Sequence, residues 1–158
     1  MKQLKRKKRM IQATRNQNSE FTANYIYADM YDVMTSIAEK PLVKITSQST
    51  NKSKVFRSGV FTTTDKERYM KITYNIAKDL SNEVLTGGVI FVGSTEYPYG
   101  FYDVVIYQNN DDTNLDPANA VKVIYKTVMN LKAVNNDAIT YTEYTETISS
   151  PTYITNTI

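Results

Sequence analysis

The chain has 158 residues, a formal net charge of +3 and 13 tyrosines, but no cysteine and no histidine. The lack of cysteine excludes disulfides and cysteine-based metal sites, and the lack of histidine removes the commonest general base and metal ligand. Because only carboxylate, lysine or tyrosine chemistry would remain, we expect a protein that is not an enzyme, with no cofactor and no metal.

The length fits a single domain that buries roughly two thirds of the surface of its unfolded chain. No stretch approaches the 18 or so apolar residues of a membrane span, so no membrane contact is expected. The basic N-terminus is not followed by an apolar run, which distinguishes it from a secretory signal. Abundant Tyr and Thr favour strands, and many Asn and Ser residues favour turns between them.

Basic side chains are concentrated at the N-terminus. Residues 1–19 carry a charge of +7 with no acid, whereas the remaining 139 residues hold 12 basic and 16 acidic side chains, a net charge of −4. A run this basic repels itself and buries little, so residues 1–40 are predicted to form an extended basic arm with a lead-in segment. The residues of the arm that we expect to bind a partner are Lys2, Lys5, Arg6, Lys7, Lys8, Arg9 and Arg15.

Three interpretations of the arm stay open. It can be a solvated tail without function, or an anchor on an acidic protein surface or on packaged nucleic acid, where each neutralised phosphate would steepen the salt dependence of binding. The third interpretation, a free nucleic-acid-binding protein, is disfavoured because the acidic body shows no basic face with interleaved aromatics. Met10 is also a possible start codon, which would make the basic run incidental.

Residues 20–40 allow two interpretations. Ile26, Met30, Val33 and Ile37 fall at helical spacing, whereas tyrosines in the same segment alternate as in a strand, and Pro41 ends it either way. Strand is favoured because the rest of the chain has β patterns.

The segment from 41 to 158 is predicted to be an immunoglobulin-like (Ig-like) antiparallel β-sandwich, with a small barrel as the second choice. Short runs with strand patterns recur between polar turns, and residues 70–76 place Met70, Ile72, Tyr74 and Ile76 on one face. The expected strands cover 42–46, 54–57, 68–76, 89–92, 101–107, one or two between 121 and 133, and 139–145. Their alternation predicts a core of Val43, Ile45, Val55, Ile72, Tyr74, Val89, Phe91, Val104, Ile106, Val123 and Tyr125.

Three blocks in this order resemble small virion structural proteins of tailed bacteriophages. The blocks are Lys66-Glu67-Arg68-Tyr69-Met70-Lys71-Ile72-Thr73, the strand from Gly100 to Tyr107 with the loop Thr113-Asn114-Leu115-Asp116-Pro117, and Thr140-Tyr141-Thr142-Glu143-Tyr144. The resemblance covers about residues 42–158. It implies a β-domain protein of the mature particle, present in many copies and without catalysis.

Two chemical motifs have simpler explanations. Asp111, Asp112 and Asp116 with neighbouring asparagines supply oxygen ligands for calcium, but no Asp-x-Asp-x-Asp-Gly pattern or following bidentate Glu accompanies them, so a polar loop is favoured. Glu143 and Glu146 could be imagined as a carboxylate pair for glycoside chemistry. Acids on Thr- and Tyr-rich strands more often keep sheet edges soluble.

Some tyrosines are expected on an aromatic rim at subunit contacts, where a large ring with a polar tip is favourable. These residues are Tyr97, Tyr99, Tyr102, Tyr141, Tyr144 and Tyr153.

From these features we expect a virion protein assembled in the host cytoplasm, most simply an auxiliary or decoration capsid protein or a head-fibre base. It would bind the major capsid protein or neck and tail proteins through its arm and sheet edges, as a homo-oligomer or bound to the capsid lattice. A neck or tail ring or adaptor and a surface carbohydrate-binding module are the alternatives. A small carboxylate-dependent hydrolase is disfavoured by the missing His and Cys.

Overall fold

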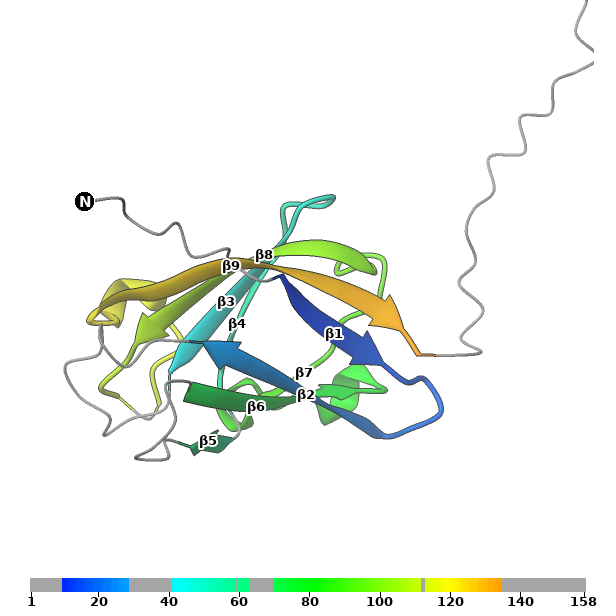
Figure 1. The fold of residues 1–158 in the computed structure, drawn as a ribbon. Helices are drawn as coiled ribbons and strands as arrows, with labels where there is room; N and C mark the ends of the chain where they lie inside the picture. The colour runs from blue at the N-terminus through cyan, green and yellow to red at the C-terminus, as the bar shows by residue number, and fades with distance from the viewer. Residues whose placement is uncertain (1–9, 29–40, 59, 63–69, 112, 135–158) are drawn as a thin grey trace, which may run out of the picture.

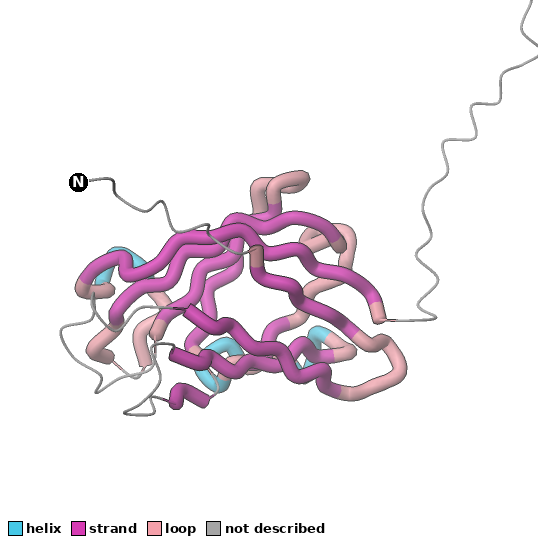
Figure 2. Tube along the Cα trace, viewed as in Figure 1, coloured by secondary structure: helices cyan, strands magenta, loops and turns pink. Residues whose placement is uncertain are grey.

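The computed structural model describes residues 10–28, 41–58, 60–62, 70–111 and 113–134, which form two β-sheets packed face to face (Figures 1 and 2). The strands are β1 (Ile11–Arg15), β2 (Phe21–Ala28), β3 (Leu42–Ser47), β4 (Ser53–Arg57), β5 (Val60–Thr62), β6 (Met70–Ala77), β7 (Val89–Ile90), β8 (Gly100–Gln108) and β9 (Lys122–Ala133). Three short 3-10 turns, η1 (Leu80–Asn82), η2 (Leu85–Gly87) and η3 (Pro117–Asn119), lie in the connections. The predicted all-β sandwich is confirmed.

The five-stranded sheet has the order β1-β9-β8-β3-β4, and the four-stranded sheet has the order β2-β6-β5 with β7 beside β6. Most pairs are antiparallel, as expected, but β1 runs parallel to β9 and β7 runs parallel to β6. The wholly antiparallel sandwich is therefore wrong at these two pairs. The pair of β1 and β9 joins the first and the last strand of the described part, a pairing that alternation within a strand does not reveal, whereas β7 follows β6 through a connection that contains η1 and η2.

Residues 11–28 of the predicted arm belong to the body. Strand β1 lies beside β9, β2 lies beside β6, and Ile11, Ala13, Ile26 and Ala28 are buried in the core. The boundary placed between residues 40 and 41 is therefore wrong. The strand prediction is confirmed for residues 21–28, whereas residues 29–40 lie outside the described part. Strand β1 was missed because it is short and follows the basic run. It has only five residues, and only two of them are buried aliphatic residues.

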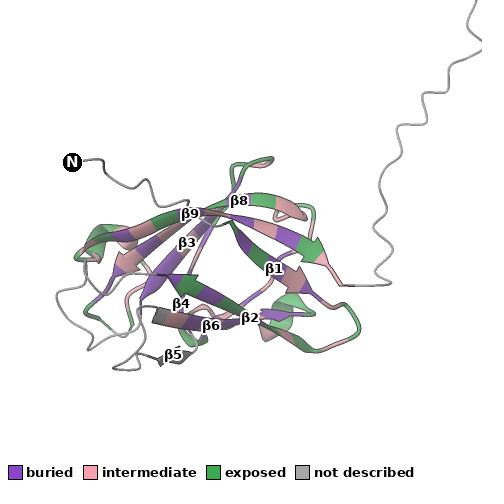
Figure 3. Ribbon diagram, in the orientation of Figure 1, coloured by how far each residue is buried: buried purple, intermediate pink, exposed green. Residues whose placement is uncertain are grey.

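Buried residues recur along the strands of both sheets (Figure 3), and their side chains form one hydrophobic core. Six of the predicted core residues are buried, namely Val43, Ile45, Ile72, Tyr74, Val104 and Ile106. A seventh, Tyr125, is partly buried and packs against the core. The rings of Phe56 and Tyr74 lie 5.3 Å apart between centroids, and the Tyr74 hydroxyl donates to the Met129 sulfur at 3.4 Å.

Four predicted core residues are not buried. In β4 and β7 the neighbouring positions Phe56 and Ile90 point inward in place of Val55 and Val89, and in the segment after β7 Val92 is buried in place of Phe91. In β9 the pairing with β8 shifts between Ile106 and Tyr107, so Val123 is 41 % exposed and Ile124 is buried. A β-bulge of this kind inserts one residue and reverses the alternation beyond it.

The predicted turns agree with the connections. Residues 48–52 join β3 to β4, with Asn51 in the left-handed conformation at φ 57°. Of the one or two strands predicted between 121 and 133, the structure has one, β9. The long polar loop predicted from 108 to 117 joins β8 to β9 and ends in η3, where the Asp116 side chain accepts from the Ala118 amide. The predicted strand over 139–145 lies outside the described residues.

Candidate interaction surfaces

The edge of β2 is open on the side away from β6, where no strand of the described part pairs with it. The Lys78 amide donates to the Glu20 carbonyl at 2.9 Å, which fixes Glu20 and Lys78 as a hydrogen-bonded pair. Because bonded and non-bonded pairs alternate in an antiparallel ladder, the even-numbered β2 residues exchange bonds with β6. The N–H and C=O groups of Ala23, Tyr25 and Tyr27 therefore point to the open edge.

Aromatic side chains line the outer face of the same strand. Phe21, Tyr25 and Tyr27 are 45 %, 43 % and 60 % exposed. The Lys71 ammonium from β6 lies 4.4 Å from the centroid of the Tyr25 ring and 5.8 Å from that of Tyr27. Such contacts of a cation with aromatic faces stabilise exposed rings by about 0.5–1 kcal/mol. The surface is thus an uncharged strand edge with two tyrosines and one lysine beside it.

A shallow groove of about 470 Å³ separates β2 from β1 on this side of the sandwich. The N-terminal end of β1 contributes Met10, which is 46 % exposed, together with Ile11, Gln12 and Thr14; β2 contributes Ala23, Asn24, Tyr25 and Tyr27. The groove and the open edge together form one surface. We call it the β2 surface.

Asn24 closes the edge of β1 above this groove. Its side-chain oxygen accepts from the Thr14 amide at 2.9 Å, and its side-chain nitrogen donates to the Thr14 carbonyl at 2.9 Å and to the Thr22 carbonyl at 3.1 Å. Asn24 is only 4 % exposed. The amide thus occupies both backbone groups of Thr14, as a neighbouring strand would, and blunts this edge.

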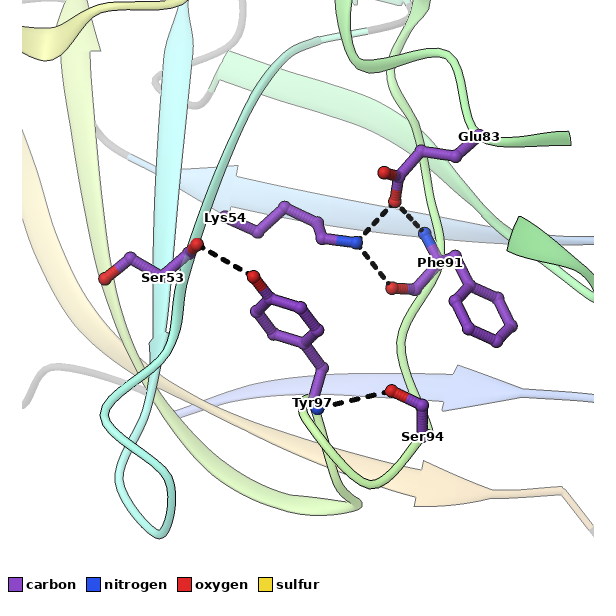
Figure 4. Close-up of polar contacts among 6 residues, drawn as sticks. All are labelled: Ser53, Lys54, Glu83, Phe91, Ser94 and Tyr97. Carbon is purple, nitrogen blue, oxygen red and sulfur yellow. Dashed lines mark hydrogen bonds and ion pairs between the residues drawn. The ribbon is translucent and has the colours of Figure 1, made fainter. Parts of the chain in front are cut away.

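An ion pair between the buried Lys54 and the partly buried Glu83 lies at the opposite edge of the five-stranded sheet, on β4 (Figure 4). The Lys54 ammonium is 2.5 Å from the Glu83 carboxylate and donates to the Phe91 carbonyl at 2.8 Å. The same carboxylate oxygen accepts from the Phe91 amide at 2.7 Å. The Tyr97 ring covers the ammonium at 4.4 Å, and its hydroxyl donates to the Ser53 carbonyl at 3.0 Å.

These contacts join β4 to the long connection from β6 to β8. Burial and the nearby carboxylates of Glu96 and Glu83 raise the pKa of Tyr97 above its usual value, so its hydroxyl keeps its proton to higher pH than that of a free tyrosine. An inward-pointing charge also discourages pairing of β4 with a foreign strand. We read this cluster as structural.

Arg15 does not belong to a partner-binding arm, which corrects the prediction for this residue. It is 7 % exposed in β1, and its guanidinium donates to the Gly93 carbonyl at 3.0 Å and to the Lys78 carbonyl at 2.9 Å. The guanidinium carbon of Arg15 lies 5.2 Å from the centroid of the Phe91 ring. Arg15 therefore ties β1 to the connection between β6 and β8. The other predicted arm residues, Lys2, Lys5, Arg6, Lys7, Lys8 and Arg9, lie outside the described part.

The structure describes three of the six tyrosines predicted for an aromatic rim. Tyr102 is fully buried, and its hydroxyl donates to the Pro98 carbonyl at 2.6 Å, so it is not a rim residue. Tyr97 and Tyr99 are half-buried and packed against the core. Tyr141, Tyr144 and Tyr153 lie outside the described residues. Tyr25 and Tyr27, whose alternation in the sequence indicated a strand, are the exposed pair.

The polar loop after β8 is held by its own side chains. The Asp111 carboxylate accepts from the Thr113 amide and from the Thr113 hydroxyl, each at 2.9 Å, and these bonds lower its pKa. Among the described residues, no group of three or more acidic side chains is placed to hold a metal ion. Glu143 and Glu146 lie outside the described part.

The described part contains no helix long and apolar enough to cross a membrane. Comparisons with family models, with curated proteins and with solved structures found no match.

Proposed function

We propose that the sandwich is of the immunoglobulin variable type. In that type one sheet contains strands B, E and D, and the other contains G, F, C and C′. The order β2-β6-β5 corresponds to B-E-D, and β9-β8-β3-β4 corresponds to G-F-C-C′, with β1 added beside β9. Tyr102 supports this assignment, because it stands near the start of the F-type strand β8 and bonds to the backbone four residues upstream, like the tyrosine corner of such domains.

We further propose that the protein is a non-enzymatic structural protein of a tailed-phage particle, acting as an auxiliary or decoration capsid protein or a head-fibre base. The β2 surface is the observation that carries this proposal. Exposed aromatic side chains next to unpaired backbone groups are suited to binding protein through strand pairing and packing. The resemblance of the three sequence blocks to phage virion proteins supports the same function.

Residues 1–9 add a second means of attachment in this proposal. They carry Lys2, Lys5, Arg6, Lys7, Lys8 and Arg9 with no acid. Attached to the end of β1 beside the β2 surface, this basic segment would bind an acidic capsid surface or packaged nucleic acid. Weak contacts of this kind become effective when many copies are held on one lattice.

The experiment is quantitative mass spectrometry of purified particles from the phage that encodes the chain, followed by image reconstruction. Hundreds of copies on the icosahedral shell are expected. Six or twelve copies at a single vertex would instead make the protein a neck or tail ring or adaptor. Absence from washed particles would overturn the proposal of a virion protein.

A carbohydrate-binding module is a second candidate, favoured by the exposed pair Tyr25 and Tyr27 beside a groove. Their rings lie 6.5 Å apart between centroids and are tilted by 40°, so they do not form a flat platform. Titration of the protein with host surface polysaccharide tests this function. Saturable binding that Tyr27→Ala abolishes would support it.

A further inference from the structure

We propose that the open edge of β2 pairs antiparallel with β2 of a second copy of this chain, so that the two four-stranded sheets join into one. This pairing is a property of the isolated chain and does not rest on the proposed place in a virion. Three features of the molecule support it: the unprotected edge of β2, the protection of the other sheet edges, and the spacing of the side chains along β2.

Strand β2 is long and carries no charge. All eight of its residues, Phe-Thr-Ala-Asn-Tyr-Ile-Tyr-Ala, are neutral, and the backbone groups of Ala23, Tyr25 and Tyr27 point away from β6. Natural proteins cover, shorten or charge such an edge, because unpaired N–H and C=O groups on a flat apolar strand template pairing with another chain. This edge has none of these protections within the described residues.

The other sheet edges are protected. The Asn24 side chain occupies both backbone groups of Thr14 on β1. Strand β4 carries the inward-pointing Lys54 and the buried Arg57, and β5 has only three residues. The contrast within one molecule indicates that the β2 edge is kept open for a partner.

The side chains of β2 complement themselves around Tyr25. In a two-fold antiparallel pair centred on Tyr25, Tyr27 of one copy lies opposite Ala23 of the other. The small Ala23 leaves room for the exposed Tyr27 ring, and the two Tyr25 rings lie side by side. A two-fold interface requires this kind of self-complementarity, and cross-strand aromatic pairs stabilise it. Met10, which is 46 % exposed beside the groove, would lie next to the second copy.

The first test is the mass in solution of the full chain, measured by light scattering after gel filtration. The wild-type chain is expected to have twice its monomer mass of 18.1 kDa. Ala23→Pro removes the N–H that points to the open edge but keeps the bonds of β2 to β6, because proline is tolerated at an edge position of this kind. It is expected to halve the mass while circular dichroism stays unchanged.

Tyr25→Lys serves as the second variant, since its side chain is exposed and the change does not touch the backbone. It is expected to halve the mass as well. Phe101→Lys is the matched control, because Phe101 is a 50 % exposed aromatic residue on the other sheet. The control should keep the dimer mass.

Cross-linking tests the register. The chain has no cysteine, so Tyr25→Cys introduces a single thiol. Paired strands lie about 4.8 Å apart, so the two thiols at position 25 would be within reach of a short bis-maleimide. Two thiols at position 73 would be separated by three strand spacings, about 14 Å. Tyr25→Cys is expected to give covalent dimers. Thr73→Cys, opposite Tyr25 on β6, is the control and should not.

Three outcomes would overturn the proposal. One is a monomeric wild-type chain at every concentration up to the millimolar range. Another is a dimer that survives both Ala23→Pro and Tyr25→Lys. The third is a dimer that is lost when residues 1–9 or residues 135–158 are deleted, because a terminal segment would then be what occupies the edge.

Discussion

The Lys54 ammonium and the Glu83 carboxylate meet 2.5 Å apart under the ring of Tyr97. Lys54 belongs to β4, the edge strand of the five-stranded sheet, and Glu83 follows η1 in the connection from β6 to β8. Because this connection has only short 3-10 turns and β7, the ion pair and the Phe91 backbone fix it to the sheet edge.

Lys54→Met is expected to lower the free energy of unfolding by about 3 kcal/mol, because it leaves the partly buried Glu83 carboxylate with only the Phe91 amide as a partner. Urea unfolding followed by circular dichroism measures the change. Lys126→Met, on the exposed face of β9, is the control and should change stability by less than about 0.5 kcal/mol. An equal effect of the two variants would contradict a structural role for the ion pair.

Asn24→Ala is expected to cost about 2 kcal/mol, because three side-chain hydrogen bonds are lost at a buried position. The Thr14 amide should also exchange its hydrogen faster, since its acceptor is removed. Amide exchange measured by NMR checks this. Asn18→Ala, in the exposed turn between β1 and β2, should leave the exchange of Thr14 unchanged.

Tyr102→Phe is expected to lower the free energy of unfolding by about 1 kcal/mol, the usual cost of losing one hydrogen bond. The lost bond is the one from its hydroxyl to the Pro98 carbonyl. Tyr107→Phe, on the same strand and only half-buried, is the control for removing a hydroxyl. Thermal unfolding of both variants measures the difference, and equal melting temperatures would contradict the assignment.

Burial raises the pKa of Tyr74 and Tyr102 above the ordinary tyrosine value of about 10. The folded protein therefore keeps these protons at a pH where the unfolded chain releases them. Stability from this source is fully present below about pH 10 and is lost as the pH rises further. Urea unfolding between pH 8 and pH 11 should show this decline, and Tyr74→Phe should make it shallower. A flat profile would contradict the raised pKa values.

Gly93→Ala is expected to destabilise the protein more than Gly100→Ala. Both glycines have positive φ, 91° and 128°, where an alanine is strained. A Cβ at Gly93 would in addition lie 2.6 Å from the Arg15 guanidinium and 3.0 Å from the Tyr99 ring, whereas one at Gly100 would meet nothing within 4 Å. Comparing the two urea midpoints isolates the steric part. The reverse order would contradict the packing around Arg15.

The sequence predicted the strands whose alternation is governed by burial alone. The strands over residues 42–46 and 70–76 were predicted correctly, because buried residues alternate with less buried ones from Val43 onward in β3 and from Lys71 onward in β6. The prediction was wrong where a polar group points inward, as Lys54 does to reach Glu83, and where the bulge beside Ile106 reverses the alternation in β9. Both features depend on partners far away in the chain, so a local pattern does not contain them.

The candidate site was harder to predict than the fold. The basic residues at the N-terminus suggested an arm that included Arg15, yet this guanidinium is placed by the carbonyls of Gly93 and Lys78, more than 60 residues away in sequence. The β2 surface had a visible signal, the uncharged segment 21–28 with alternating tyrosines. It indicated a strand, but only the pairing with β6 shows which side of that strand is open.

The parallel pair of β1 and β9 has a mechanical consequence. The chain enters β1 at Ile11, beside Met129, and leaves β9 at Ala133, beside Arg15, so a pull on the two ends of the body drives the strands past each other lengthwise. All the backbone hydrogen bonds between them then bear the load together, whereas a hairpin pulled at its ends would open one bond at a time. A domain tethered at both ends should therefore resist stretching.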